Sequence, residues 1–347
     1  MNDSNPVRLA VVGVGLIGSK HANLVNSQRN CSLVGICDLN SGQKEIAEEL
    51  QVPFYSNLEE LLECEQPEGV IIATPNGSHA HLAEVCAKHL VPILIEKPIA
   101  DSIEAAEKIS KLKGIQVLVG HHRRHNPLIQ KTRHIVQSGV LGQLVAISMM
   151  WTLLKPADYF QVDWRCHLPD GGPTLINLIH ELDVLRFVCG EIRQVYAQSA
   201  LSIRNLEVED SLAITLSFNS GAVGSVLASD ATSSPWSYEM NTGENPYYFH
   251  IGENCYHFLG TLGSFSFPRM ELWRYPNQRE KGWQYPLEKS IQKVVREDPL
   301  KKQLEHFCRV IRDKEPPLVD SQDGKRSLAV ALAVLKSIKK GEPIVLA

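Results

Sequence analysis

Gly13-Val14-Gly15-Leu16-Ile17-Gly18 is the stretch that decides the fold. It follows an apolar run, Arg8 to Val12, and it precedes a helical pattern that passes through His21 and Ala22. In a turn of this kind the glycines allow a tight bend, close approach of a pyrophosphate to the backbone, and close packing of the helix on the strand. Because the N–H groups of a helix N-terminus favour negative charge, the stretch predicts a dinucleotide-binding loop.

Asp38 supports this prediction and refines it. It ends the second apolar run, about twenty positions after the last glycine, where a carboxylate can accept hydrogen bonds from the adenosine ribose. The same charge would repel a 2′-phosphate, and no arginine follows in Leu39-Asn40-Ser41-Gly42 to neutralise one. The sequence therefore favours NAD over NADP. The alternative is an Asx turn, in which Asp38 only bonds nearby backbone.

The first part of the chain has the pattern of a parallel sheet. From residue 7 to about residue 122, short runs of Val, Ile and Leu alternate with helical stretches, as expected for buried strands in βαβ units. We predict strands at 8–12, 33–37, 69–73, 93–95 and 116–119, and helices at 41–50, 58–63, 78–89 and 103–111. This predicts an α/β fold whose first domain, residues 1–122, is a Rossmann doubly wound parallel sheet that binds the dinucleotide.

After His122 the pattern becomes that of an α+β domain, predicted over residues 123–347. Several of its strands look antiparallel, and Asn219-Ser220-Gly221 between two of them is a hairpin signal. We predict helices at 127–138, 174–188, 299–312 and 326–340, and strands at 144–154, 195–199, 211–218 and 222–228.

Glu96-Lys97-Pro98 closes the apolar run from Val91 to Ile95. In an open parallel sheet, ligands bind beyond the carboxyl ends of the strands, so Lys97 is expected to point into the site and Glu96 to lie beside the cofactor. The alternative is a solvated lysine with Glu96 as a weak ion-pair partner.

A second polar group, Thr74-Pro75-Asn76, follows the strand at 69–73 in the same way. Together with His79 it is expected to contact the nicotinamide half of the cofactor. A plain helix cap explains Asn76 equally well.

The second domain has its own candidate for chemistry in the helix predicted at 174–188, which Gly171-Gly172-Pro173 introduces. At about 100° per residue, Asn177 and His180 fall opposite the main apolar face. His180 could therefore act as a base near neutral pH, with Asp183 one turn later. The alternative is a packed histidine whose ring is satisfied by Asp183.

In this ordered set of motifs the chain resembles the glucose-fructose oxidoreductase and inositol dehydrogenase (Gfo/Idh/MocA) family. The resemblance covers essentially the whole chain and rests on the glycine loop with His21, Asp38, Thr74-Pro75-Asn76 with His79, Glu96-Lys97-Pro98, Gly171-Gly172 and His180-x-x-Asp183. It implies a Rossmann domain followed by an α+β domain with a large open sheet, mainly antiparallel here, that commonly forms a dimer or tetramer interface. It also implies that Lys97 contacts substrate and nicotinamide, that the Lys97-Pro98 bond is often cis, and that His180 is an acid/base acting on a secondary alcohol.

One departure from the family concerns the proton. Many members carry an aspartate four residues before the histidine, and Ile176 stands at that position here. Asn177 can hydrogen-bond a substrate hydroxyl but cannot titrate. We therefore expect Lys97 and His180 to handle the proton without that carboxylate, and this puts inositol dehydrogenation proper in doubt.

Two charged segments are candidates for contact with the substrate. No carboxylate or cysteine with ligand spacing accompanies the histidines of the segment 121–127, so we predict no metal, and the segment is either a solvated turn or an anion-recognising edge. The segment 155–165, which includes Trp164, suits a pocket wall or an exposed loop. Arg124, Lys155 and Arg165 could together bind a carboxylate, which would make the substrate an acidic polyol.

Composition limits the partners. The chain has 347 residues and a formal net charge of -4, without the basic run that nucleic-acid binding needs. The 8 cysteines include no Cys-x-x-Cys pair and read as reduced core residues. The polar start and the lack of a run long enough to span a bilayer predict a cytoplasmic protein.

The sequence thus predicts an NAD-dependent oxidoreductase that transfers hydride between nicotinamide and a secondary alcohol or ketone of a polyhydroxylated substrate: a sugar, a cyclitol or one of their acids. A homodimer or homotetramer is expected. The alternative is a non-catalytic regulatory protein of the same fold that binds NAD or a sugar.

Overall fold

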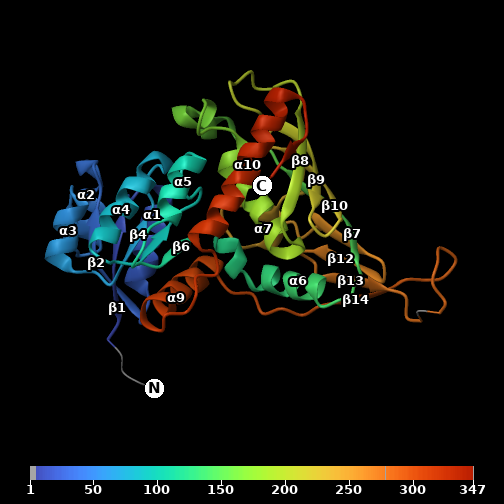
Figure 1. Ribbon diagram of the computed structural model, residues 1–347, viewed down its shortest axis with the longest axis horizontal. Coiled ribbons are helices and arrows are strands. Elements are labelled where there is room, and N and C mark those ends of the chain that lie inside the picture. The colour runs from blue at the N-terminus through green and yellow to red at the C-terminus, as the bar shows by residue number, and fades with distance from the viewer. Residues whose placement is uncertain (1–4, 278, 347) are drawn as a thin grey trace. The chain divides into compact units, whose positions relative to one another are not determined.

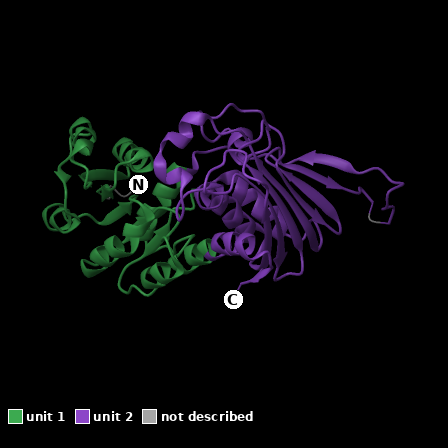
Figure 2. Ribbon diagram, turned by 90° about the horizontal axis from the view of Figure 1, so that it is seen from above, with its two compact units in different colours: residues 1–122, 300–328 green, residues 123–299, 329–347 purple. Residues whose placement is uncertain are grey.

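The computed structural model describes residues 5–277 and 279–346, which form two compact units. The first unit comprises residues 1–122 and 300–328, and the second comprises 123–299 and 329–347 (Figure 2). The sequence places all of 123–347 in one domain, whereas the segment 300–328 lies in the first unit.

The sheet of the first unit is parallel throughout and has the strand order β3-β2-β1-β4-β5-β6 (Figure 1). This order, which reverses between β1 and β4, is that of the predicted Rossmann fold. The strands are β1 (Val7–Val12), β2 (Cys31–Cys37), β3 (Phe54–Tyr55), β4 (Gly69–Ile72), β5 (Ile93–Ile95) and β6 (Val117–Val119). The two-residue β3 was not predicted because it is too short to show a pattern.

The helices of this unit are α1 (Leu16–Ser27), α2 (Lys44–Glu49), α3 (Leu58–Glu65), α4 (His79–Lys88), α5 (Ile103–Ser110) and, near the C-terminus, α9 (Pro299–Arg312). The apolar face of α9 explains why residues 300–328 belong here. Leu304, Phe307 and Ile311 join Val11 and Ile71 of the sheet in one buried cluster. Burying such side chains contributes roughly 1.5–3 kcal/mol each, so α9 completes the core of the Rossmann unit.

The second unit contains a nine-stranded sheet with the order β14-β13-β12-β11-β7-β10-β9-β8-β15. Among the described residues of this sheet only β7 and β10 pair in parallel, so the predicted large, mainly antiparallel sheet is confirmed. Its strands are β7 (Leu144–Thr152), β8 (Ile192–Ser199), β9 (Ser211–Phe218), β10 (Val223–Ser229), β11 (Tyr256–Gly260), β12 (Gly263–Phe267), β13 (Glu271–Arg274), β14 (Glu288–Ile291) and β15 (Ile344–Val345).

The turn between β9 and β10 shows how local sequence fixes part of this sheet. Gly221 has a φ of 90°, which glycine adopts without strain, and the N–H of Phe218 bonds the carbonyl of Ala222. The predicted hairpin at Asn219-Ser220-Gly221 is therefore present. By contrast the sequence predicts none of the strands from β11 to β15, and in β14 all four residues are exposed and carry no apolar alternation.

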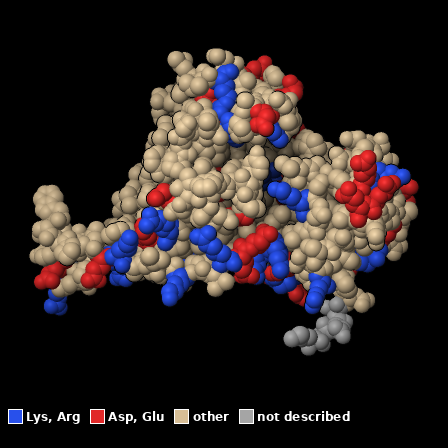
Figure 3. Space-filling view, turned by 180° about the vertical axis from the view of Figure 1, so that it is seen from behind, with Lys and Arg blue, Asp and Glu red and all other residues tan. Residues whose placement is uncertain are grey.

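The helices of the second unit include α6 (Pro127–Gln137), α7 (Ile179–Cys189) and α8 (Tyr238–Thr242), and α10 (Ser321–Lys340) begins in the first unit and ends in the second. Among the described residues, no helix combines the length and the apolar character that crossing a bilayer requires. On the face shown in Figure 3, basic and acidic side chains lie interspersed.

The single helix predicted at 174–188 is instead two pieces: a π-helical turn at Thr174–Leu178 followed by α7. A π-helix has more residues per turn than an α-helix, so a regular helical wheel does not carry across the junction. Every residue from Ile179 to Val188 is buried, so the predicted apolar face is covered and the opposite face, which carries His180 and Glu181, is covered as well.

Candidate functional site

Three predicted motifs of the first unit lie at the ends of three neighbouring strands. The register pairs Val12 of β1 with Ile72 of β4, and Ile72 with Ile95 of β5, so these strands end level with one another. The glycine loop follows β1, Thr74-Pro75-Asn76 follows β4, and Glu96-Lys97-Pro98 follows β5. This edge is the switch point of the sheet, where ligands of open α/β folds bind.

The three glycines of the loop meet different surroundings. Gly13 has a φ of 81°, and a Cβ there would lie 2.7 Å from Thr74 Cγ2. A Cβ on Gly18 would lie 1.8 Å from the carbonyl oxygen of Gly13, so packing demands both of these glycines. Gly15 differs, because a Cβ there would meet no heavy atom within 4 Å. The absent Gly15 side chain leaves the backbone open to a ligand.

The start of α1 suits an anion. Gly15 caps this 12-residue helix without any side-chain hydrogen bond, and the first turn contains no acidic residue. The N–H groups that begin a helix attract negative charge when no side chain satisfies them. The residues present therefore fit the pyrophosphate of a dinucleotide, with Leu16 exposed in the first turn.

Asp38 binds the backbone of the glycine loop. It also forms the Asx turn that the sequence offers as an alternative to ribose binding. Its Oδ2 accepts the N–H of Val14 at 2.8 Å, and its Oδ1 accepts the N–H of Asn40 at 2.8 Å. Since each carboxylate oxygen has two lone pairs, both can also accept a ribose hydroxyl.

His79 lies beneath the strand ends rather than at their surface. It is fully buried, with Nε2 2.9 Å from the Thr74 carbonyl oxygen and Nδ1 3.1 Å from that of Pro98. Burial lowers the pKa of His79, although the surrounding carbonyls oppose the shift. The ring thus joins the end of β4 to the turn after Lys97, which is a positioning contact.

Glu96 is likewise buried, at 6% exposure. Its Oε1 lies 2.7 Å from His21 Nε2, and its Oε2 accepts the N–H of Lys97 at 3.2 Å. The Lys97-Pro98 peptide bond is cis, and the Lys97 side chain is half-buried. Glu96 therefore braces the turn that presents Lys97.

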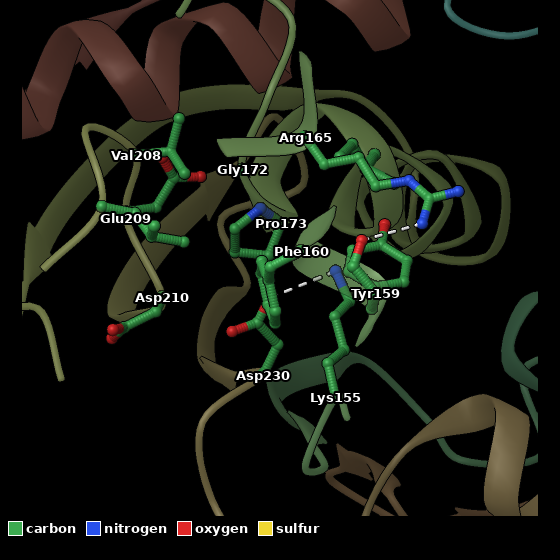
Figure 4. Close-up of a pocket in the computed structure, with 12 residues that line it drawn as sticks. Lys155, Tyr159, Phe160, Arg165, Gly172, Pro173, Val208, Glu209, Asp210 and Asp230 are labelled. Carbon is green, nitrogen blue, oxygen red and sulfur yellow. Dashed lines mark hydrogen bonds and ion pairs between the residues drawn. The ribbon is translucent and has the colours of Figure 1, made fainter. Parts of the chain in front are cut away.

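In the second unit, Asn177 lies in the π-helical turn and His180 in the first turn of α7, where His180 is 7% exposed. The Oδ1 of Asn177 accepts a hydrogen bond from Lys155 Nζ at 2.8 Å, and the same ammonium lies 3.1 Å from Asp230 Oδ2. Figure 4 shows Lys155 and Asp230 pointing toward each other. Burial lowers the pKa of Lys155, while the Asp230 carboxylate opposes the shift.

The two arginines of the segment 121–127 are buried, so the predictions of a solvated turn or an anion-recognising edge were both wrong for them. Arg124 binds Asp183 through two hydrogen bonds, of 2.9 Å from Nε and 2.6 Å from Nη2. Arg123 pairs with Glu181 at 2.5 Å and with Glu239 at 2.7 Å. Both guanidinium groups are therefore already paired with acids. The pair of Arg124 with Asp183 anchors α7, in which Asp183 lies.

Arg165 and Trp164 are more accessible. Arg165 donates to the carbonyl of Tyr159 at 2.9 Å and lies over the Tyr159 ring, 4.2 Å from its centroid. Among the described residues it forms no ion pair with a carboxylate. Trp164 is 50% exposed. Arg165 is thus the arginine of the predicted set whose charge is not matched within the described structure.

Sequence reasoning missed Asp230 as a support of the site, and it named His21 as part of the glycine-loop motif without its contact to Glu96. Asp230 follows β10 directly, and β10 runs parallel to β7, whose end leads to Lys155. The strand-end rule that found Lys97 would have found Asp230 too, but the parallel pairing of β7 with β10 is not visible in the sequence.

Comparison with known proteins gives matches along nearly the whole chain. Residues 7–121 match the family model GFO_IDH_MocA, "Oxidoreductase family, NAD-binding Rossmann fold", and residues 133–346 match its partner, "Oxidoreductase family, C-terminal alpha/beta domain". The myo-inositol 2-dehydrogenase of Thermotoga maritima is 23% identical, over 96% of this chain and 97% of its own. The scyllo-inositol 2-dehydrogenase (NAD(+)) of Bacillus subtilis is 27% identical, over 97% of this chain and 96% of its own.

A solved structure agrees in fold. The WlbA dehydrogenase of Bordetella pertussis, in complex with NADH and UDP-GlcNAcA, superposes with a TM-score of 0.80 at 22% identity and covers 99% of both chains. The glycine loop, the strand order and the two family models therefore agree, and the chain belongs to the NAD-binding Gfo/Idh/MocA oxidoreductase family.

Proposed function

We propose that this protein oxidises a secondary alcohol of a polyhydroxylated substrate with NAD, or reduces the corresponding ketone. The observation that carries the proposal is the convergence of the glycine loop, Thr74-Pro75-Asn76 and Lys97 at three adjacent strand ends. The names of the relatives, a myo-inositol and a scyllo-inositol dehydrogenase, support a cyclitol, a sugar or a related acid as the substrate class. They also support an enzyme over the regulatory alternative.

In this proposal the first unit holds the cofactor. The N–H groups at Gly15 and the start of α1 bind the pyrophosphate, and Asp38 accepts hydrogen bonds from the ribose while repelling a 2′-phosphate. Thr74, Pro75 and Asn76 line the nicotinamide end of the same edge. NAD, when bound, accepts or supplies the hydride. Glu96 and His79 do not contact the cofactor in this proposal, and they act by fixing the turn that carries Lys97.

Lys97 and His180 handle the proton. The Lys97 ammonium stabilises the alkoxide that forms as the alcohol loses its proton, and it relays that proton by giving up one of its own as it takes the one from the hydroxyl. His180 serves as the general acid/base, since an imidazole titrates near neutral pH. Asn177 orients a substrate hydroxyl from one turn before His180. Ile176 has no titratable group, so proton transfer falls to Lys97 and His180.

We also propose that the substrate carries an acidic group and that Arg165 and Trp164 contact it. Support comes from the unmatched charge of Arg165 among the described residues and from the exposure of Trp164. A guanidinium can bind a carboxylate through two hydrogen bonds. Lys155 and Arg124, which were predicted to take part, are already paired with Asp230 and Asp183 and contribute through those pairs.

Assembly through the nine-stranded sheet completes the proposal. The side chains that point outward from β9 and β10 are exposed and uncharged: Ala213, Thr215, Val223, Ser225 and Leu227. An uncharged face of small and aliphatic residues suits close packing of a second copy. Light scattering of Leu227→Lys should show smaller particles than wild type if this face forms a homodimer or homotetramer.

A substrate panel tests the proposed activity. Purified protein is incubated with NAD and with cyclitols, neutral sugars and sugar acids, and the absorbance of reduced nicotinamide is followed. We expect turnover with at least one polyol and higher kcat/KM for acidic members than for their neutral counterparts. NAD binding without turnover across the panel would contradict the proposal and favour a regulatory protein.

A further inference from the structure

The ammonium of Lys155 is nearly buried and makes three contacts within the protein. Its side chain is 9% exposed, and Nζ donates to Asn177 Oδ1 at 2.8 Å, pairs with Asp230 Oδ2 at 3.1 Å, and lies 4.4 Å from the centroid of the Tyr159 ring. A lysine has three N–H donors. Two of them have polar partners in Asn177 and Asp230, and the ammonium also lies over the Tyr159 ring, so Lys155 has little freedom to turn toward a ligand.

Asp230, the anchor of this lysine, is fixed in turn by Arg204. Asp230 is 1% exposed, and its Oδ1 accepts a hydrogen bond from Arg204 Nη1 at 2.5 Å. Arg204 Nη2 also donates to the backbone carbonyls of Asp230, at 2.5 Å, and of Lys155, at 3.3 Å. The Lys155 ammonium is therefore placed by a buried network and does not reach Asn177 by chance rotation of a mobile side chain.

The contact determines which way the Asn177 amide faces. An ammonium can only donate, so the oxygen of the amide must face Lys155 and its NH₂ group must face the other way. Asn177 is half-buried, and none of the hydrogen bonds found among the described residues uses its Nδ2. What Asn177 presents away from Lys155 is thus a pair of N–H donors.

We propose that Lys155 is a positioning residue that locks the Asn177 amide with its N–H donors toward the substrate, so that Asn177 binds an acceptor oxygen of the substrate: the reacting hydroxyl, its ketone, or a neighbouring hydroxyl. This inference rests on the proposed function, in which Asn177 touches the substrate. It replaces direct binding of a substrate carboxylate by Lys155.

Two variants of Lys155 isolate the hydrogen bond from the charge. Lys155→Gln and Lys155→Met both remove the positive charge beside Asp230, but only glutamine offers an N–H that can donate to Asn177 Oδ1. We expect kcat/KM to fall about tenfold to a hundredfold in Lys155→Met, the scale of losing one hydrogen bond to the reacting group, and to recover largely in Lys155→Gln. A purely structural role would give both variants the same kcat/KM.

Asn177→Asp tests the other side of the contact. Its carboxylate can still accept from Lys155, so the urea midpoint of unfolding should stay near that of wild type, while the loss of N–H donors lowers kcat/KM by about tenfold or more. Because the two residues act as a unit, Lys155→Met added to Asn177→Asp should cost little further activity. If the loss of kcat/KM in the double variant equals the product of the losses in the two single variants, the inference is overturned.

The outcomes separate this inference from the proposed function. If no substrate of the panel supports NAD reduction by the wild type, the proposed function fails. If the wild type is active and Lys155→Met equals it in kcat and KM, the function stands and the positioning role of Lys155 is overturned.

Discussion

His21 Nε2 lies 2.7 Å from Glu96 Oε1, and both side chains are buried. The contact joins α1, whose N-terminus is proposed to bind the pyrophosphate, to the residue before Lys97. The other oxygen of Glu96 accepts the Lys97 N–H at 3.2 Å. One carboxylate therefore couples the cofactor loop to the turn that carries the proposed catalytic lysine.

This pair makes the first unit sensitive to acid. Burial alone would raise the pKa of Glu96, but the hydrogen bond from His21 and the charges of His21, His122 and Lys97 outweigh it and hold the pKa below its ordinary value of 4.5. A depressed folded pKa means that Glu96 contributes stability above pH 4.5 and loses it as the pH falls through the lower folded value.

Glu96→Gln should therefore lower the free energy of unfolding at neutral pH and flatten its decline in acid. Urea unfolding of both proteins, from neutral pH to well below 4.5, measures this difference. Parallel curves for the two proteins over that range would show that Glu96 has no such linkage.

Gly15 and Gly18 should respond oppositely to alanine. The Cβ of Gly15→Ala enters open space at a φ of -65°, so the fold should keep its Tm while NAD affinity falls by about tenfold or more, or about 1.4 kcal/mol. The Cβ of Gly18→Ala would lie 1.8 Å from the carbonyl oxygen of Gly13, and overpacking of this kind costs about 1–3 kcal/mol. Calorimetry of unfolding and of NAD binding separates the two effects. Unchanged NAD affinity in Gly15→Ala would place the pyrophosphate elsewhere.

Arg124 and Arg165 should also differ, although the sequence predicts the same role for both. Arg124→Met leaves the Asp183 carboxylate buried with Arg186 Nη1 at 3.9 Å, so we expect a loss of about 3–5 kcal/mol in the free energy of unfolding. Arg165→Met, at a half-exposed site, should leave stability nearly unchanged and raise KM for acidic substrates alone. A stable Arg124→Met with raised KM for acids would reverse the assignment.

The parts of the fold that sequence predicts well are those where one pattern determines one structure. The runs at residues 9–12 and at Gly69–Ile72 contain no charged residue because both faces of the strands are covered there, and the glycine loop admits few alternatives. The two-residue β3 and the exposed β14 carry no such pattern.

The site is harder to predict where long-range contacts determine whether a side chain is buried and paired. Arg123 and Arg124 look like surface charges in a sequence, and only the tertiary fold brings Glu181, Glu239 and Asp183 to them. The π-helical turn at Thr174–Leu178 has no local signal either, and it changes the direction of Asn177 relative to a regular helix. The position of Lys97 just after β5 is predictable because a strand end is a local feature, and its role at the site stays a prediction from the rule that ligands bind at such ends.

The central claim is that Lys97 promotes hydride transfer to NAD from a carbon that bears a hydroxyl. The most direct measurement uses the best substrate of the panel with deuterium on that carbon and follows the label into reduced NAD in the wild type and in Lys97→Met. We expect the label in the nicotinamide of the wild-type product, and a rate about a hundredfold to ten-thousandfold lower in Lys97→Met with NAD affinity retained. A product without the label, or a Lys97→Met variant as fast as the wild type, would contradict the account.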